Sequence, residues 1–354
     1  MTFDRRSFLS SLAALPLATS GITQVHAAPT AAELAKAPKP EQLTLLGYGG
    51  PFDVVTKKYV ADPFTAATGI PVTIRGGSSD LISSLRVQKD HPQYDLVHIG
   101  FDSYSLLLRN NVFDAIDAAQ IPNAAHLYPI ARSSHGLATT ITAVAIVYNT
   151  ERIKRPITSW NDLWDPAFKG HVAIEKVPAT YGMDTLVMAA RLAGGSEKNI
   201  DPGFKKLVQL KPNLGAIYTN SSQCQQLFAQ GGIWIAPWYS GRVASTVKAG
   251  VPVAAAQTKE GEPVYLTMMC PLKGKWNPWV AQFMNMHLNV DVQQAFAKEF
   301  ASGPSRTDVK LEPAVARTVP YGHDAVGRLI QFDWDTIIPH VDEWTQRFNR
   351  EIAA

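Results

Sequence analysis

The sequence predicts an α/β protein built as two lobes. From Gln42 onward, short apolar runs alternate with longer amphipathic stretches, which is the pattern that strands and helices produce in a layered α/β fold. The chain has 354 residues, and those that follow residue 27 are more than one compact core usually organises. We therefore expect two lobes, each built from strands and helices.

The first 27 residues have the pattern of an export signal. Arg5 and Arg6 precede an apolar run over 8–17, and small residues at Val25 and Ala27 fit a cleavage site. The arginine pair indicates the twin-arginine type, with the general secretory route as the alternative. We expect the mature chain to work in the periplasm and to start with a flexible linker over 28–41.

Charge and composition exclude two classes of protein. The 33 basic and 30 acidic residues are spread without blocks, so we expect no nucleic-acid partner. After residue 27, nothing approaches the roughly 18 apolar residues that a membrane helix needs. Cys224 and Cys270 match no metal-binding spacing, and they form either a disulfide or two buried thiols.

Strand and helix signals alternate through the first part of the mature chain. The breaker at 69–71 separates the first predicted helix from the second strand, and the glycines after 75 open the next helix. The predicted strands are 43–46, 72–75 and 94–99, and the predicted helices are 53–67, 76–89 and 104–109.

The second part begins with a long strand at 139–148, whose β-branched residues suit a strand that crosses between lobes. Ser159 and Asp162 then fit a capping box at a helix start, and Trp160 and Trp164 are expected in the core. The remaining predicted strands are 172–175, 231–238, 251–256 and 264–269, and the remaining predicted helices are 182–192, 221–229, 279–287, 290–300 and 335–352.

Two blocks of sequence carry a resemblance to a known family. Residues 145–151 (AIVYNTE) and 158–170 (TSWNDLWDPAFKG) resemble the same stretch in bacterial extracellular solute-binding proteins of the spermidine/putrescine-binding type. The resemblance extends roughly over 43–315. It implies a type II periplasmic binding protein fold: two lobes, each a mixed sheet flanked by helices, joined by crossing hinge strands. It also implies a monomer that closes on a small-molecule solute and delivers it to the membrane permease of an ABC importer.

We place the lobe boundaries within the crossing strands. Lobe 1 is expected to contain 42–138 plus 268–315, and lobe 2 is expected to contain 139–267 plus 316–354.

In open α/β sheets, ligands collect beyond the carboxyl ends of strands, where helix starts present unpaired N–H groups. We therefore expect the cleft at five strand-end loops, which are 49–50, 76–79, 100–102, the loop after Glu175, and 238–240.

The chain keeps only part of the equipment that polyamine-binding relatives use. The resemblance places Trp238 and Tyr265 at aromatic positions of the cleft and Glu175 near an acidic one. Thr267 stands where amine-binding relatives place an aspartate, and Arg242 brings a cation close to the cleft. A dication would lose one partner and gain one repulsion. We therefore favour an anionic or zwitterionic organic solute, with a polyamine as the alternative.

Each group of candidate residues receives a role. We expect the solute to be stacked or walled by Trp238, Tyr239 and Tyr265. Its acidic group is held by Arg242, Ser78 and Ser79, and any amine by Glu175 or Asp102. The candidate ligand-binding residues are Tyr48, Gly49, Ser78, Ser79, Phe101, Asp102, Glu175, Tyr181, Trp238, Tyr239, Ser240, Arg242, Tyr265 and Thr267.

Catalysis and metal binding are the remaining alternatives. The sequence contains no nucleophile elbow, zinc-protease motif, phosphate loop or dinucleotide fingerprint, so we expect no catalytic residue and no cofactor, against the alternative of an exported enzyme. Ferric-ion-binding relatives resemble this fold and place two adjacent tyrosines in the second lobe. Here that pair reads Trp238 and Tyr239, and we expect no metal ligand.

Overall fold

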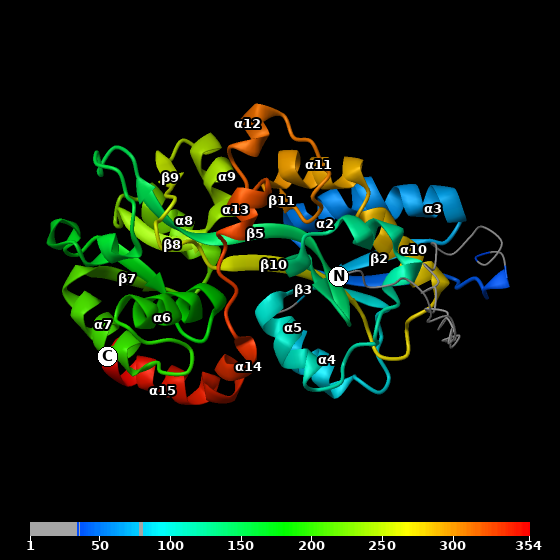
Figure 1. Cartoon of the computed structure of the whole chain (residues 1–354), viewed down its shortest axis with the longest axis horizontal. Coiled ribbons are helices and arrows are strands. Elements are labelled where there is room, and N and C mark those ends of the chain that lie inside the picture. Colours follow the sequence, from blue (N-terminus) through cyan, green and yellow to red (C-terminus); the bar gives the residue numbers. More distant parts are fainter. Residues whose placement is uncertain (1–33, 35, 78–80) are drawn as a thin grey trace, which may run out of the picture.

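The computed structural model describes residue 34, residues 36–77 and residues 81–354. The predicted export signal, Ser78 and Ser79 lie outside these described residues. Two α/β lobes lie next to each other and are joined by long strands (Figure 1). No helix in the described part of the chain has both the length and the apolar character needed to cross a bilayer. The expectation of a two-lobe α/β fold with mixed sheets is confirmed.

The described residues form eleven strands that are connected into one sheet. Its main order is β2 (Val72–Gly76), β1 (Leu43–Gly47), β3 (Leu96–Gly100), β10 (Val264–Pro271), β5 (Gly136–Asn149), β8 (Ile235–Tyr239), β6 (Val172–Glu175) and β7 (Leu214–Tyr218). Three further strands pair with β5: β4 (Arg132–Ser133), β9 (Val253–Ala255) and β11 (Gly303–Pro304). Strand β1 is parallel to β2 and β3, whereas β10 is antiparallel to both β3 and β5.

Strand β5 is the long crossing strand that the sequence predicts. Its first half pairs with β10 in the first lobe, and its second half pairs with β8 and β9 in the second lobe. Figure 1 shows β5 and β10 running from one lobe to the other. Almost every residue of β5 is buried, in keeping with its run of apolar and β-branched side chains.

The first lobe covers its sheet with helices that bury one apolar face. They are α2 (Gly50–Thr56), α3 (Asp62–Thr68), α4 (Leu81–Val87), α5 (Phe101–Leu108), α10 (Pro278–His287) and α11 (Val290–Phe300), and a π-helical segment (Lys57–Ala61) joins α2 to α3. The first helix is therefore continuous over 50–68 and longer than predicted. It ends at Gly69, whose φ of 68° is easiest for glycine.

The second lobe carries α6 (Thr180–Leu192), α7 (Asp201–Leu210), α8 (Ser221–Ala229), α9 (Val243–Lys248), α14 (Trp334–Ile337) and α15 (Val341–Glu351). The single helix predicted over 335–352 is wrong, because a short 3₁₀ turn containing Pro339 separates α14 from α15. Two short helices, α12 (Pro313–Ala316) and α13 (His323–Gly327), precede this segment. The other 3₁₀ segments are Ala118–Gln120, Pro122–His126, Pro129–Ala131, Trp160–Trp164, Pro166–Phe168, Lys211–Asn213 and Ser240–Arg242, and the turn with Pro339 is Ile338–His340.

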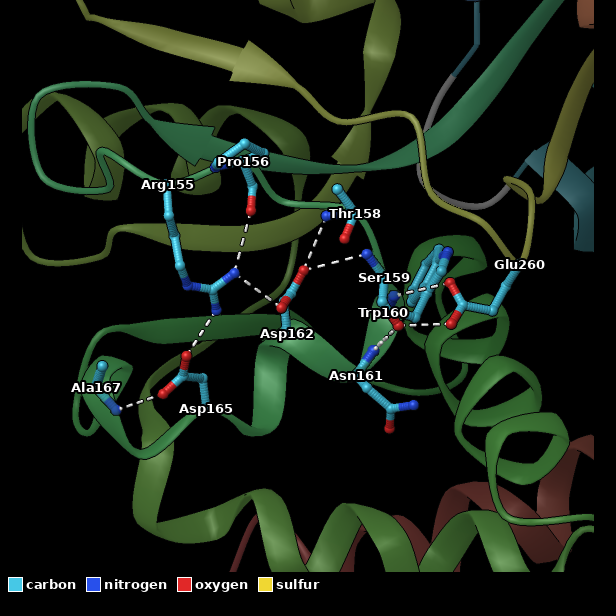
Figure 2. Close-up of polar contacts among 10 residues, drawn as sticks. All are labelled: Arg155, Pro156, Thr158, Ser159, Trp160, Asn161, Asp162, Asp165, Ala167 and Glu260. Atoms are coloured by element: carbon cyan, nitrogen blue, oxygen red, sulfur yellow. Dashed lines mark hydrogen bonds and ion pairs between the residues drawn. The ribbon is translucent and has the colours of Figure 1, made fainter.

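The motif that carries the family resemblance has a structural role (Figure 2). Ser159 caps a 3₁₀ helix, and the Asp162 carboxylate accepts the Ser159 N–H at 3.1 Å, so the capping box is confirmed. Arg155 holds the same carboxylate at 3.0 Å. The Glu260 carboxylate accepts one hydrogen bond from the Ser159 hydroxyl at 2.5 Å and another from the backbone N–H of the fully buried Trp160 at 3.2 Å. These contacts fix the connection between β5 and β6.

The two cysteines lie in different apolar clusters. Cys224 is buried on α8 in the second lobe, and Cys270 is buried on β10 in the first. Both thiols are free. Of the two alternatives left by the sequence, the structure has the pair of buried thiols.

Candidate functional site

A cavity of about 190 Å³ lies between the two lobes. It is found where β1, β7 and β8 end and the following helices begin. The first lobe contributes Tyr48, Gly49, Pro51, Phe52 and Phe300, the second contributes Tyr181, Ser221, Tyr239 and Arg242, and β10 contributes Tyr265 and Thr267. This is the edge of the sheet at which open α/β folds bind ligands.

Three tyrosines form one aromatic wall of this cavity, which we call the tyrosine box. The rings of Tyr239 and Tyr265 meet edge to face with 5.4 Å between centroids, and those of Tyr181 and Tyr239 lie nearly parallel at 6.3 Å. Burial raises the pKa of all three hydroxyls above the usual 10. The phenols are therefore neutral at physiological pH, and they offer O–H donors and electron-rich ring faces.

The backbone N–H groups at two helix starts are already satisfied. Asp53 accepts hydrogen bonds from the N–H of Tyr48 at 3.1 Å and of Gly49 at 2.8 Å. Glu175 accepts one from the N–H of Tyr181 at 2.9 Å. The sequence reasoning expected such groups to be open to the solute, and at these two positions that expectation is wrong because nearby carboxylates take them.

Arg242 is the cation of the cavity wall. It lies in the 3₁₀ turn that follows β8 and is only partly exposed. It makes no ion pair with any carboxylate among the described residues. Its positive charge is close enough to the tyrosine box to lower the pKa of Tyr181 and Tyr239, against the larger effect of burial. An acidic group in the cavity would find its guanidinium available for a charge-assisted hydrogen bond.

Three carboxyl groups lie near the tyrosine box without lining the cavity, and in this sense they are behind it. Asp102 Oδ2 accepts a hydrogen bond from Thr180 Oγ1 at 2.9 Å, which joins α5 of the first lobe to α6 of the second. Glu175 is 5% exposed, and burial together with the charge of Asp102 raises its pKa to about 7. Asp184 is buried as well, and its Oδ2 has no hydrogen-bond partner among the described residues.

These carboxyl groups act on each other and on the box. Burial raises the pKa of Asp184 well above its usual value, and the charges of Asp102 and Glu175 raise it further. The charge of Asp102 also raises the pKa of Tyr265, and that of Glu175 raises the pKa of Tyr181. A negative charge behind a phenol favours a cation in front of it.

Seven of the fourteen predicted residues line the cavity, namely Tyr48, Gly49, Tyr181, Tyr239, Arg242, Tyr265 and Thr267. Trp238 does not line it: the side chain is fully buried, packs against Phe228 and donates its indole N–H to Ser221 Oγ at 2.7 Å. Because neighbouring side chains of a strand point to opposite faces, Tyr239 faces the cavity in its place.

The other predicted residues have different positions. Asp102 and Glu175 lie behind the tyrosine box, Phe101 packs against Tyr104, and the Ser240 hydroxyl accepts the Ala143 N–H at 3.3 Å. Ser78 and Ser79 fall outside the described residues. The sequence reasoning missed Pro51, Phe52, Ser221 and Phe300, which line the cavity.

One missed residue had a usable signal. Ser221 starts the predicted helix at 221–229, directly after β7, and β7 was not predicted. A strand assigned to 214–218 would have placed this hydroxyl at a strand end. Phe300 carried no such signal, because it is the last residue of α11 and reaches the cavity only through the packing of α11 on α2.

Comparisons with known proteins agree with this architecture. The sequence profile described as bacterial extracellular solute-binding protein matches residues 59–320. The gamma-aminobutyric acid-binding protein of Pseudomonas aeruginosa is 23% identical over 323 residues, which cover 87% of this chain and 90% of that protein. The spermidine/putrescine-binding periplasmic protein of Escherichia coli is 24% identical over 253 residues, covering 67% of this chain and 71% of that protein.

A solved structure of an ABC transporter from Clostridium perfringens matches with a TM-score of 0.77 at 26% identity, over 88% of this chain and 100% of that one. The profile match spans more than half of the chain, and it includes the tyrosine box and Arg242. The chain belongs to the bacterial extracellular solute-binding protein family.

Proposed function

We propose that this protein captures a small zwitterionic solute, with an amine and at least one acid group, and delivers it to the membrane permease of an ABC importer. One observation carries the proposal: Arg242, without an ion pair among the described residues, lies in the same cavity as a tyrosine box with three carboxyl groups behind it. One relative is named a gamma-aminobutyric acid-binding protein, and gamma-aminobutyric acid is a zwitterion of this kind.

The amine of the solute belongs in the tyrosine box. An ammonium group is attracted to the face of an aromatic ring, and the attraction grows when water is excluded. The rings of Tyr239 and Tyr265 meet edge to face with 5.4 Å between centroids, and Asp102 and Glu175 add negative charge behind the box. This arrangement supports a cation there without a carboxylate in direct contact.

The acid group of the solute belongs next to Arg242. A guanidinium binds a carboxylate through paired N–H donors, which fixes the orientation of the solute as well as its charge. A polyamine would place its second ammonium near this guanidinium, and we expect that to cost about 1–3 kcal/mol. Thr267, whose side chain cannot ionise, offers no compensating anion in the cavity wall.

Delivery requires that the permease distinguish the loaded protein from the empty one. A solute that contacts both lobes stabilises the conformation in which they are together, and a permease can read that shape. We place this step in the periplasm, as a monomer, and assign the protein no catalytic step. A purified sample that chemically converted a bound solute would contradict this part of the proposal.

A matched set of probes tests the proposal. γ-Aminobutyrate should raise the melting temperature, because it binds the folded state, whereas butylamine and butyrate should each have little effect. Putrescine tests the alternative of polyamine binding. A clear shift with putrescine or spermidine and none with γ-aminobutyrate would contradict our assignment.

The variant Arg242→Gln tests the acid-binding role. We expect it to weaken γ-aminobutyrate binding 10- to 100-fold in isothermal titration calorimetry, because the carboxylate loses its charged partner. Arg328→Gln is the control, since this exposed arginine does not line the cavity. Equal affinity of the Arg242 variant and the control would remove Arg242 from the site.

A further inference from the structure

A second cavity of about 360 Å³ adjoins the first and shares Pro51, Arg242 and Phe300 with it. We call this second cavity the outer compartment. Its other wall residues are Gly241, Ala244, Ser245, Lys248, Lys298, Glu299 and Ala301. Helix α9 of the second lobe and the end of α11 of the first lobe face each other across it, so it also lies between the lobes.

The outer compartment has an excess of positive charge. Arg242, Lys248 and Lys298 line it, and none of the three forms an ion pair with a carboxylate among the described residues. The single acidic residue in the wall, Glu299, is engaged elsewhere: its Oε1 accepts a hydrogen bond from Lys58 at 3.1 Å and another from the Tyr59 hydroxyl. The wall therefore keeps a net positive charge.

We infer that the outer compartment binds a second acid group of the solute, so that the preferred solute is an amino acid with two carboxylates. The inference rests on the proposed function, because it extends the same cleft beyond Arg242. Lys248 and Lys298 come from different lobes, so their like charges oppose closure of the cleft. A carboxylate between them removes this repulsion and stabilises the closed arrangement.

Two derivatives of γ-aminobutyrate provide a matched test. One carries a 2-carboxyethyl branch on the carbon next to the carboxylate, and the other carries a propyl branch of the same length there. We expect the 2-carboxyethyl derivative to bind at least tenfold more tightly in calorimetry at low ionic strength. In the double variant Lys248→Gln/Lys298→Gln its affinity should fall about tenfold, while that of the propyl derivative changes less than twofold.

The control is Lys154→Gln/Lys169→Gln, which removes the same charge from exposed positions outside both cavities. Three outcomes would overturn the inference. The first is equal affinity of both derivatives for the unmodified protein, and the second is equal weakening of both by Lys248→Gln/Lys298→Gln. The third is failure of both derivatives to bind when γ-aminobutyrate binds. If γ-aminobutyrate and both derivatives all fail to bind, the proposed function fails as well.

Discussion

The Thr180 hydroxyl donates a hydrogen bond to the Asp102 carboxylate from the opposite lobe, with 2.9 Å between the two oxygens. Thr180 is the first residue of α6, and Asp102 lies in the first turn of α5. A second contact across the lobes joins the Arg109 guanidinium to Asp335 at 3.1 Å, but there both side chains are well exposed. Both contacts exist only while the lobes are together, so they belong to the closed arrangement.

We expect Thr180→Val to weaken solute binding about fivefold. The substitution keeps the shape of the side chain and removes one hydrogen bond, worth about 1 kcal/mol, from the closed arrangement alone. Calorimetry with γ-aminobutyrate measures the effect. Thr345→Val is the matched control, because that hydroxyl donates to the Val341 carbonyl within α15.

The exposed pair provides a contrast. Asp335→Asn should change solute affinity less than twofold, because solvent-exposed ion pairs contribute little. If Thr180→Val bound solute like the unmodified protein, the hydrogen bond to Asp102 would have no part in closure.

Trp238→Phe should weaken solute binding through Ser221. Phenylalanine keeps most of the buried ring volume but removes the indole N–H that holds the Ser221 hydroxyl at 2.7 Å. Since Ser221 lines the cavity, we expect a two- to fivefold loss of affinity with a stability loss of about 1–2 kcal/mol. Trp238→Ala would instead cost about 3–5 kcal/mol of stability, because it leaves a void in the core.

A double-variant cycle separates positioning from general damage. In a Ser221→Ala background, Trp238→Phe should have no further effect on affinity, while the part of its destabilisation that comes from the smaller ring should persist in urea-induced unfolding. An undiminished loss of affinity in that background would rule out a role through Ser221.

The sequence predicted the fold more completely than the site, and Trp238 and Tyr239 explain why. Both are aromatic and adjacent in β8, and an aromatic pair at a strand end does not reveal which ring faces the cleft. The position of Arg242 near the cleft could be predicted from the sequence, because it follows the same strand end by three residues. The cavity walls formed by Phe52 and Phe300 depend on packing between helices that are far apart in the sequence, which no local pattern encodes.

Affinity for an amine should increase as the pH rises from 6 to 8. The pKa of Glu175 is raised to about 7, mainly by burial, so its negative charge behind the tyrosine box develops over this range. Glu175→Gln should flatten the dependence, because glutamine can still accept the Tyr181 N–H but cannot ionise. Calorimetry of γ-aminobutyrate at each pH measures it, and an unchanged slope in the variant would assign the titration to Asp102 or Asp184.

The raised pKa of Glu175 also predicts how the stability of the ligand-free protein depends on pH. A carboxyl group whose folded pKa lies above its usual 4.5 holds its proton more tightly when folded, so stability falls as the pH rises from 4.5 to 7. The loss is about 3 kcal/mol at full ionisation, from 1.36 kcal/mol for each pKa unit. Urea denaturation across this range should therefore show Glu175→Gln gaining on the unmodified protein as the pH rises.

Two buried histidines predict the opposite slope. The rings of His98 and His287 are 5.0 Å apart in the core of the first lobe, and none of their four nitrogens has a hydrogen-bond partner among the described residues. Burial lowers the pKa of both, that of His287 to about 4. Because the folded state favours the neutral rings, their contribution to stability is complete above pH 6.5 and is lost as the pH falls towards 4.

His287→Leu should therefore lose less stability than the unmodified protein between pH 6.5 and 4.5. It also removes two unsatisfied ring nitrogens from an apolar site, so we expect the variant to be as stable as the unmodified protein at pH 7.5. Urea denaturation of this variant, of Glu175→Gln and of the unmodified protein separates the two groups. Below pH 6.5, Glu175→Gln makes the slope of stability against pH more positive, whereas His287→Leu makes it more negative. A His287→Leu curve parallel to that of the unmodified protein would mean that this ring is hydrated and titrates normally in the folded state.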